Sequence, residues 1–179
     1  MTNKKELISL AREGIKAKLE GRDFIIDEEI KRRFKEKKAC FVTLTLDGKL
    51  SGCIGSLTAR QELWKDAVEN AINAAFFDSR FCPLTKEEFN KIKIEISILS
   101  IPTKIEYKDG RDLKKKIFKK GVLLKKDFYS ATYLPQVWEQ IPREEDFLNS
   151  LCLKAGLSGS TWKREKLNVF VYDVEKVEE

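Results

Sequence analysis

A hairpin signal near residue 47 constrains the fold more than any other feature of the sequence. Residues 39–46 are rich in strand-forming side chains, and Asp47-Gly48 follows them directly. An Asp-Gly pair flanked by hydrophobic runs is the strongest short-range hairpin signal, because both residues accept the positive φ angles of a tight turn. Residues 50–57 then return as the partner strand. The sequence therefore predicts antiparallel pairing of these two strands.

A two-residue loop at this turn also fixes the expected register. It places Cys53 opposite Val42, so that Cys40 becomes a diagonal neighbour of Cys53 on the same face. Diagonal neighbours lie roughly 7–8 Å apart, which is too far for an easy disulfide. We therefore expect two separate thiols on one face of the hairpin.

The rest of the chain shows both strand and helix periodicity. Alternating isoleucines at 92–98 predict a strand buried on one face, residues 122–134 predict a second hairpin, and residues 167–174 predict a final strand before an acidic tail. Apolar residues at helical spacing predict helices over residues 3–19, 27–37, 58–77, 112–120 and 147–155. Three pairs have the spacing of helix caps: Asn3 with Glu6, Thr58 with Gln61, and Thr85 with Glu88.

Mixed helices and hairpins predict an α+β fold, with an antiparallel or mixed sheet and flanking helices. The length of 179 residues fits a single domain over residues 1–179. Within it we expect a larger lobe and a smaller lobe that contains the second hairpin, at about residues 103–140.

The chain contains no histidine. A Ser-His-Asp or Cys-His catalytic couple is therefore excluded within it, and no imidazole can bind a metal or titrate near neutral pH. The four cysteines are widely spaced and form no CxxC motif. We expect free thiols, no bound metal and no cofactor, and the sequence does not decide whether the protein is an enzyme.

Location is predicted from three features. Widely spaced cysteines without a disulfide framework fit a reducing compartment. No run of residues approaches the ~20 apolar residues of a membrane helix, and the N-terminus leads into a charged helical pattern rather than a signal-peptide core. We expect a cytoplasmic protein without a membrane segment.

The net charge of +6 is concentrated in the lysine-rich segment 114–126. Such a segment either contacts phosphates or forms a solvated face. It lacks the interleaved arginines and exposed aromatics of a base-reading surface. The solvated face is the favoured interpretation, and nucleic acid is not an expected partner.

The segment Gly52-Cys53-Ile54-Gly55 is the strongest candidate site. Glycine weakens a strand interior and there marks a bulge or a close approach by a ligand or another backbone. In one interpretation, bare backbone lines a shallow site into which Cys53 projects. In the other, the glycines allow tight packing against an alanine-rich helix and Cys53 is a small buried hydrophobe.

Two further segments carry candidate residues. Asp78 and Arg80 stand two apart in a loop, where they either pair with each other or form an anion clamp, since a guanidinium binds carboxylate or phosphate bidentately. After the second hairpin, Gln136 and Trp138 either line a pocket or, in the case of Trp138, belong to the core.

Five segments join these candidates to a known family: Leu50–Leu57, Ala74–Phe81, Glu95–Ser100, Tyr133–Trp138 and Phe147–Leu157. In this order they resemble the AMME syndrome chromosomal-region domain family over about residues 5 to 175. Prokaryotic members of that family include protein A of the AmmeMemoRadiSam system. The resemblance implies a compact α+β domain with a larger and a smaller lobe and a cleft near the Gly-Cys-Ile-Gly motif. It also implies Memo-type and radical-SAM proteins as partners, but it implies no particular reaction.

The chain departs from the family pattern at two positions. Ser51 stands where the family motif usually has arginine, which predicts a less activated Cys53 if that arginine tunes the thiol. Cys82 stands where proline is common, so no role is expected of it.

The preferred hypothesis is a ligand- or substrate-binding domain with a cleft at the Gly-Cys-Ile-Gly motif. If the domain is an enzyme, the expected catalytic residues are Cys53, as the thiol, and Arg80, as the partner of an anion or thiolate. One alternative is a non-catalytic protein-interaction module, and a weaker one is nucleic-acid binding through residues 114–126. The expected substrate-binding residues are Gly52, Ile54, Gly55, Asp78 and Gln136.

Overall fold

The computed structural model describes residues 4–179, so the predicted cap at Asn3 lies outside the described residues. Over this range the chain forms eight helices and two four-stranded antiparallel sheets, which confirms the α+β class. It divides into two compact units, each with its own sheet and hydrophobic core. The first unit comprises residues up to Leu99 together with Glu175–Glu179, and the second comprises Ser100–Val174. The segment 103–140 therefore lies within the second unit.

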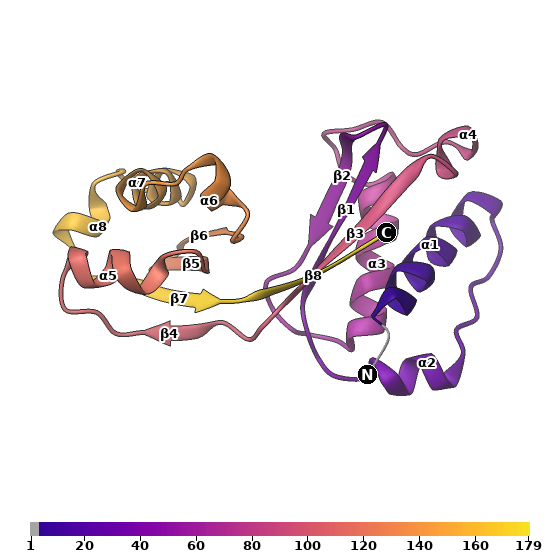
Figure 1. The fold of residues 1–179 in the computed structure, drawn as a ribbon, viewed down its shortest axis with the longest axis horizontal. Helices are drawn as coiled ribbons and strands as arrows, with labels where there is room; N and C mark the ends of the chain where they lie inside the picture. The colour runs from indigo at the N-terminus through magenta and orange to yellow at the C-terminus, as the bar shows by residue number, and fades with distance from the viewer. Residues whose placement is uncertain (1–3) are drawn as a thin grey trace. The chain divides into compact units, whose positions relative to one another are not determined.

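The sheet of the first unit has the strand order β2-β1-β3-β8 (Figure 1). Because β1 pairs antiparallel with both β2 and β3, β2 is an edge strand. The expected acidic tail is instead the strand β8, whose Val177 packs against the core of this unit. The strands are β1 (Cys40–Leu46), β2 (Lys49–Gly55), β3 (Ile92–Leu99) and β8 (Val174–Glu178).

Helices α1 (Lys5–Glu20) and α3 (Leu63–Phe76) pack against each other and against this sheet. In Figure 1, α3 lies behind the sheet, where it contacts β1 and β2. Alternate residues of β1 are buried beneath the helices, as a strand covered on one face requires. Two short helices, α2 (Glu28–Arg33) and α4 (Lys86–Phe89), complete the unit. The capping box predicted from Thr85 and Glu88 is present at the start of α4.

The first hairpin forms at the predicted turn, but its register differs from the expected one. Beside the turn the pairing follows a two-residue loop. A bulge at Ser51 then shifts the pairing by one residue, so that Cys53 pairs with Thr43 rather than with Val42. Because side chains alternate between faces, this shift places Cys53 on the opposite face from Cys40. The expectation of two cysteines on one face is therefore wrong.

Helix α3 begins at Leu63, later than the predicted start at Thr58. The predicted capping box is absent, because the residue before the helix is Glu62 and its side chain makes no capping hydrogen bond. The Gln61 amide instead donates to Asp66 Oδ1 at 3.3 Å. The Gln61 side chain, which the sequence assigned to the capping box, thus binds the buried Asp66 of α3 instead.

The second unit contains the strand order β4-β7-β5-β6 and four helices (Figure 1). Its core includes a stack of Phe147 on Trp138, with ring centroids 3.9 Å apart and planes 3° apart. Trp138 is buried and donates Nε1–H to the Lys120 carbonyl at 2.8 Å, so it is a core residue. The elements are β4 (Thr103–Ile105), α5 (Gly110–Ile117), β5 (Gly121–Lys126), β6 (Tyr129–Tyr133), α6 (Val137–Gln140), α7 (Glu144–Lys154), α8 (Thr161–Arg164) and β7 (Asn168–Tyr172).

The chain enters and leaves the second unit at one point. The backbone N–H of Ser100 donates to the Asp173 carbonyl at 2.9 Å, and the Asp173 N–H donates to Ser100 Oγ at 2.9 Å. These two bonds hold the entering and leaving segments together.

Candidate functional site

Cys53 projects from the face of the first sheet opposite α3. Its neighbour Gly52 faces the helix so closely that a Cβ atom there would lie 2.1 Å from the carbonyl oxygen of Ala74. Successive strand residues point to opposite faces, so the thiol points away from the helix. Its Sγ lies 3.4 Å from Thr43 Oγ1, and the residue is half-buried. The Gly-Cys pair thus combines a tight contact on one face with a half-buried cysteine on the other.

Asp78 and Arg80 hold the backbone of Cys53 at the outer edge of β2. The Cys53 N–H donates to Asp78 Oδ2 at 2.9 Å, and Arg80 Nη2 donates to the Cys53 carbonyl at 3.0 Å. The guanidinium also donates to both carboxylate oxygens, from Nε at 2.9 Å and from Nη2 at 2.7 Å. Two side chains therefore occupy the place that a further strand would take at this edge.

The contact between Asp78 and Arg80 shifts the pKa values of both side chains. Asp78 is only 6% exposed. Hydrogen bonding from Arg80, assisted by the Cys53 N–H, holds the pKa of Asp78 well below its usual range despite the opposing effect of burial. The carboxylate in turn raises the pKa of Arg80. Of the two interpretations of this loop, the structure shows the pairing, and the arginine contacts the carbonyl oxygen of Cys53.

The other motif residues have clear packing partners. A Cβ at Gly55 would lie 2.3 Å from the ring of Phe41, so this glycine admits the ring across the hairpin. Ile54 is partly buried against the core of the first unit. Both glycines of the motif therefore permit close approaches within the protein. A substrate-binding role for Gly52, Ile54 and Gly55 remains a prediction.

Two cavities are lined by neighbours of Cys53, although Cys53 itself lines neither of them. One of about 300 Å³ lies over β1, β3 and β8, and is lined by polar residues that include Thr43, Thr45, Lys93 and Glu95. Another, of about 320 Å³, lies beside the hairpin bulge. The first cavity shares Thr43 with the thiol contact. Lining residues of the second include Leu50, Ser51, Phe81, Cys82 and Glu88.

A buried polar cluster on α3 was not anticipated from the sequence. Asp66, which is 5% exposed, accepts from the Cys40 N–H at 2.9 Å and from Asn70 Nδ2 at 3.0 Å. Asn70 also donates to the Cys40 carbonyl at 3.1 Å. The signal was available, because Asp66 and Asn70 are one helical turn apart and interrupt the apolar face of the helix. The cluster fastens the start of β1 to α3.

The remaining cysteines differ in exposure. Cys40 and Cys152 are buried and Cys82 is exposed. Burial raises the pKa of the Cys40 thiol, an effect that nearby Asp66 strengthens, and burial also raises the pKa of Cys152. Among residues 4–179, no group of three or more cysteines and acids is arranged to hold a metal ion.

Gln136 belongs to the second unit. It is the residue before α6, its backbone carbonyl accepts from the Glu139 N–H at 3.1 Å, and it is partly buried. The structure therefore places Cys53, Asp78 and Arg80 together in the first unit. The role of Gln136 at that site stays a prediction.

Comparison with known proteins identifies the family. The AMMECR1 family model matches residues 8–177 of the chain. The chain belongs to the AMMECR1 family. This is the AMME syndrome chromosomal-region family that the five sequence segments resemble.

Relatives of this AMMECR1-family chain match it over nearly its whole length. A protein from Nanoarchaeum equitans is 38% identical over 181 residues, which cover 97% of this chain and 98% of the relative. A protein from Methanocaldococcus jannaschii is 35% identical over 181 residues, covering 96% and 88%. The crystal structure of the uncharacterized protein PH0010 from Pyrococcus horikoshii matches with a TM-score of 0.86 and 32% identity, covering 97% of this chain and 90% of that one. These AMMECR1 relatives are uncharacterised proteins.

Over residues 4–179 of this AMMECR1-family chain, no helix has both the length and the apolar character needed to cross a membrane.

Proposed function

We propose that this AMMECR1-family chain is a ligand- or substrate-binding domain whose site lies on the open face of the first sheet around Cys53. One observation carries the proposal: the thiol is half-buried, lies opposite the core face and is within hydrogen-bond reach of the Thr43 hydroxyl at 3.4 Å. A cysteine retained only for packing would point into the core, as Cys40 does.

The surroundings of the thiol support binding more than hydrolysis. The chain has no histidine to serve as a general base for Cys53. The Asp78–Arg80 pair immobilises the backbone on either side of the thiol, which reduces the entropy lost when a ligand is held there. The adjoining cavity of about 300 Å³ is at the lower end of the usual range for small-molecule sites, and Thr43, Lys93 and Glu95 supply polar contacts.

Thiol reactivity in the native protein tests the proposal. Brief iodoacetamide labelling followed by mass spectrometry should modify Cys53 and the exposed Cys82 well before Cys40 and Cys152, because alkylation requires an accessible thiolate. Thr43→Val should change the labelling rate of Cys53 several-fold while leaving Cys82 unchanged as an internal control. A Cys53 as inert as Cys40 in the folded protein would remove the basis for the site.

The same measurement tests the partners and location that the family resemblance implies. We propose that Memo-type and radical-SAM proteins act with this chain in a reducing cytoplasm, a setting supported by its four free cysteines. Labelling repeated with each candidate partner in excess should protect Cys53 if the partner binds at the site. Unchanged labelling with both proteins would count against them as partners at this site.

A further inference from the structure

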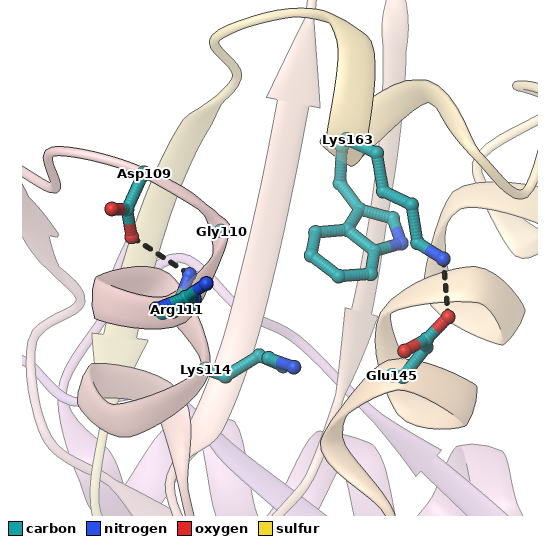
Figure 2. Close-up of a pocket in the computed structure, with 7 residues that line it drawn as sticks. Asp109, Gly110, Arg111, Lys114, Glu145 and Lys163 are labelled. Carbon is teal, nitrogen blue, oxygen red and sulfur yellow. Dashed lines mark hydrogen bonds and ion pairs between the residues drawn. The ribbon is translucent and has the colours of Figure 1, made fainter.

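The second unit contains a groove, remote in sequence from the Cys53 motif, that is lined mainly by charged side chains. It has a volume of about 550 Å³ and is bordered by the start of α5, by α7 and by α8 (Figure 2). Three cations and two carboxylates contribute to its lining, with a glycine and a tryptophan. These residues are Arg111, Lys114, Lys163, Asp109, Glu145, Gly110 and Trp162.

Both carboxylates of the groove are already engaged. Asp109 caps α5 by accepting from the backbone N–H groups of Arg111 at 2.8 Å and Asp112 at 2.9 Å. Those bonds lower the pKa of Asp109. Glu145 is paired with Lys163. The acidic side chains are therefore held by partners within the protein.

Two of the three cations are not engaged in this way. Across residues 4–179, the side chains of Arg111 and Lys114 make neither a hydrogen bond nor an ion pair, although the charge of Arg111 helps to lower the pKa of Asp109 and that of Lys114 helps to lower the pKa of Glu145. They lie one turn apart on α5 and so share a face of the helix. In Figure 2, Lys114 extends from α5 across the groove toward the Glu145–Lys163 pair. The groove thus presents an arginine and a lysine to the same space.

Packing against Trp162 fixes the position of the first turn of α5, which contains Arg111. A Cβ at Gly110 would lie 3.0 Å from the indole of Trp162, so this residue brings the first turn of α5 against the ring. Trp162 is 5% exposed and donates Nε1–H to Asn149 Oδ1 at 2.8 Å. The first turn of the helix is therefore held in place before any ligand arrives.

Five of the other six lysines of the basic segment have partners in the described structure, and Lys115, which has none, does not line the groove. Lys116 pairs with Asp112, Lys120 pairs with Asp173, and Lys126 pairs with Glu165. Lys119 and Lys125 lie over the aromatic rings of Phe118 and Phe170. A continuous track of free cations, which a nucleic-acid backbone would need, is absent from the described part of the segment.

We propose that this groove binds the phosphate group of a small phosphorylated ligand. The Arg111 guanidinium offers a planar fork that matches phosphate oxygens, and Lys114 adds a point charge one turn away. A volume of about 550 Å³ accommodates a small phosphorylated molecule rather than a single free ion. The groove belongs to the second unit and the Cys53 motif to the first, and the proposal does not depend on the function proposed for Cys53.

Titration of the full chain with pyrophosphate, followed by backbone NMR shifts, tests the proposal. Saturable shifts should concentrate at residues 109–114, 145 and 162–163. Lys114→Gln and Arg111→Gln should each raise the Kd at least tenfold, because each removes a charge-assisted contact. Lys115→Gln is the matched control, since it removes the same charge from the adjacent residue of α5, which does not line the groove.

Several outcomes would overturn the proposal. Equal weakening by Lys115→Gln would show that binding follows general charge rather than this groove. Equal displacement by succinate would show a site for carboxylates. Tighter binding of a single-stranded RNA than of pyrophosphate, with equal losses on substitution of Lys115 and Lys119, would indicate a nucleic-acid surface instead of a phosphate groove. Shifts that do not saturate would exclude a built site.

Discussion

At the scale of single residues, Asp78 has the largest structural role near the candidate site. It accepts hydrogen bonds from the Cys53 N–H and from three groups of Arg80: the backbone N–H, Nε and Nη2. The sequence allowed the Asp78–Arg80 pair to be anticipated, and the preferred hypothesis placed Arg80 beside the Cys53 thiolate, but nothing indicated that the pair hydrogen-bonds the backbone of Cys53. That contact depends on a loop folding back onto an edge strand, and local spacing carries no information about such a return.

We predict that Asp78→Asn lowers the free energy of unfolding at pH 7 by about 1–3 kcal/mol, since it replaces charged hydrogen bonds with weaker ones. The folded-state pKa of Asp78 is depressed. Its contribution is therefore present above the unfolded value of about 3.9 and is lost as pH falls below it. Urea unfolding of both proteins at pH 7 and pH 3 should show the difference between them shrinking at the lower pH.

Arg80→Lys provides the companion to this variant. It keeps the charge but loses the fork that reaches Asp78 and the Cys53 carbonyl together. It should lie between the wild type and Asp78→Asn in stability at pH 7. A gap between wild type and Asp78→Asn that stays constant with pH would show that the carboxylate is not the stabilising group.

At the scale of elements, the bulge at Ser51 decides which face carries the thiol. The turn at Asp47-Gly48 was predictable because its conformation is local, and both residues have positive φ, 50° and 76°. The glycines of the motif indicated either a bulge or a close approach, but not that both occur, with the bulge at Ser51 and the close approach to α3 at Gly52. A one-residue error in register then reversed the predicted face of Cys53. The class of the fold thus followed from periodicity, whereas the orientation of the site did not.

Because Gly52 lies against α3, we predict that adding one methyl group at this position lowers the stability of the protein. Gly52→Ala would place Cβ 2.1 Å from the Ala74 carbonyl oxygen, which is backbone and cannot rotate away. We expect the free energy of unfolding to fall by about 1–3 kcal/mol, as for other overpacked sites. Thermal unfolding followed by circular dichroism measures the change.

Gly159→Ala is the matched control for this substitution. Its nearest neighbour would lie at 3.5 Å, an ordinary contact, so the change should be smaller than about 1 kcal/mol. Equal stability of Gly52→Ala and Gly159→Ala would contradict the close approach of β2 to α3.

At the scale of the whole molecule, each unit buries its own core. Leu7, Val42 and Ile96 belong to one cluster, and Leu124 and Phe147 belong to the other. The sequence indicated a separate lobe near the second hairpin, but it did not indicate that residues 141–174 join the same unit. The sequences of helix α7 and strand β7 do not indicate which unit they join. Their packing with Trp138 and Val122 places them in the second unit.

Truncating Phe147 should reveal how far the two cores are coupled. The side chain is fully buried and stacks on Trp138. Phe147→Ala should therefore cost about 3–5 kcal/mol. We predict faster hydrogen exchange across residues 100–174, with little change at β1, β3 and α3, when mass spectrometry follows both units in the native protein. An equal increase in both units would show that they unfold as one.

The return of the chain to the first sheet has a consequence for biosynthesis. Strand β3 is translated before residues 100–174, and β8, its neighbour in the sheet, is translated after them. Throughout that interval the nascent protein displays the outer edge of β3, whose backbone groups are open to other chains. The inserted unit, by contrast, has all four of its strands within one uninterrupted stretch of message. The time needed to translate that stretch therefore sets how long the first sheet lacks β8 during synthesis.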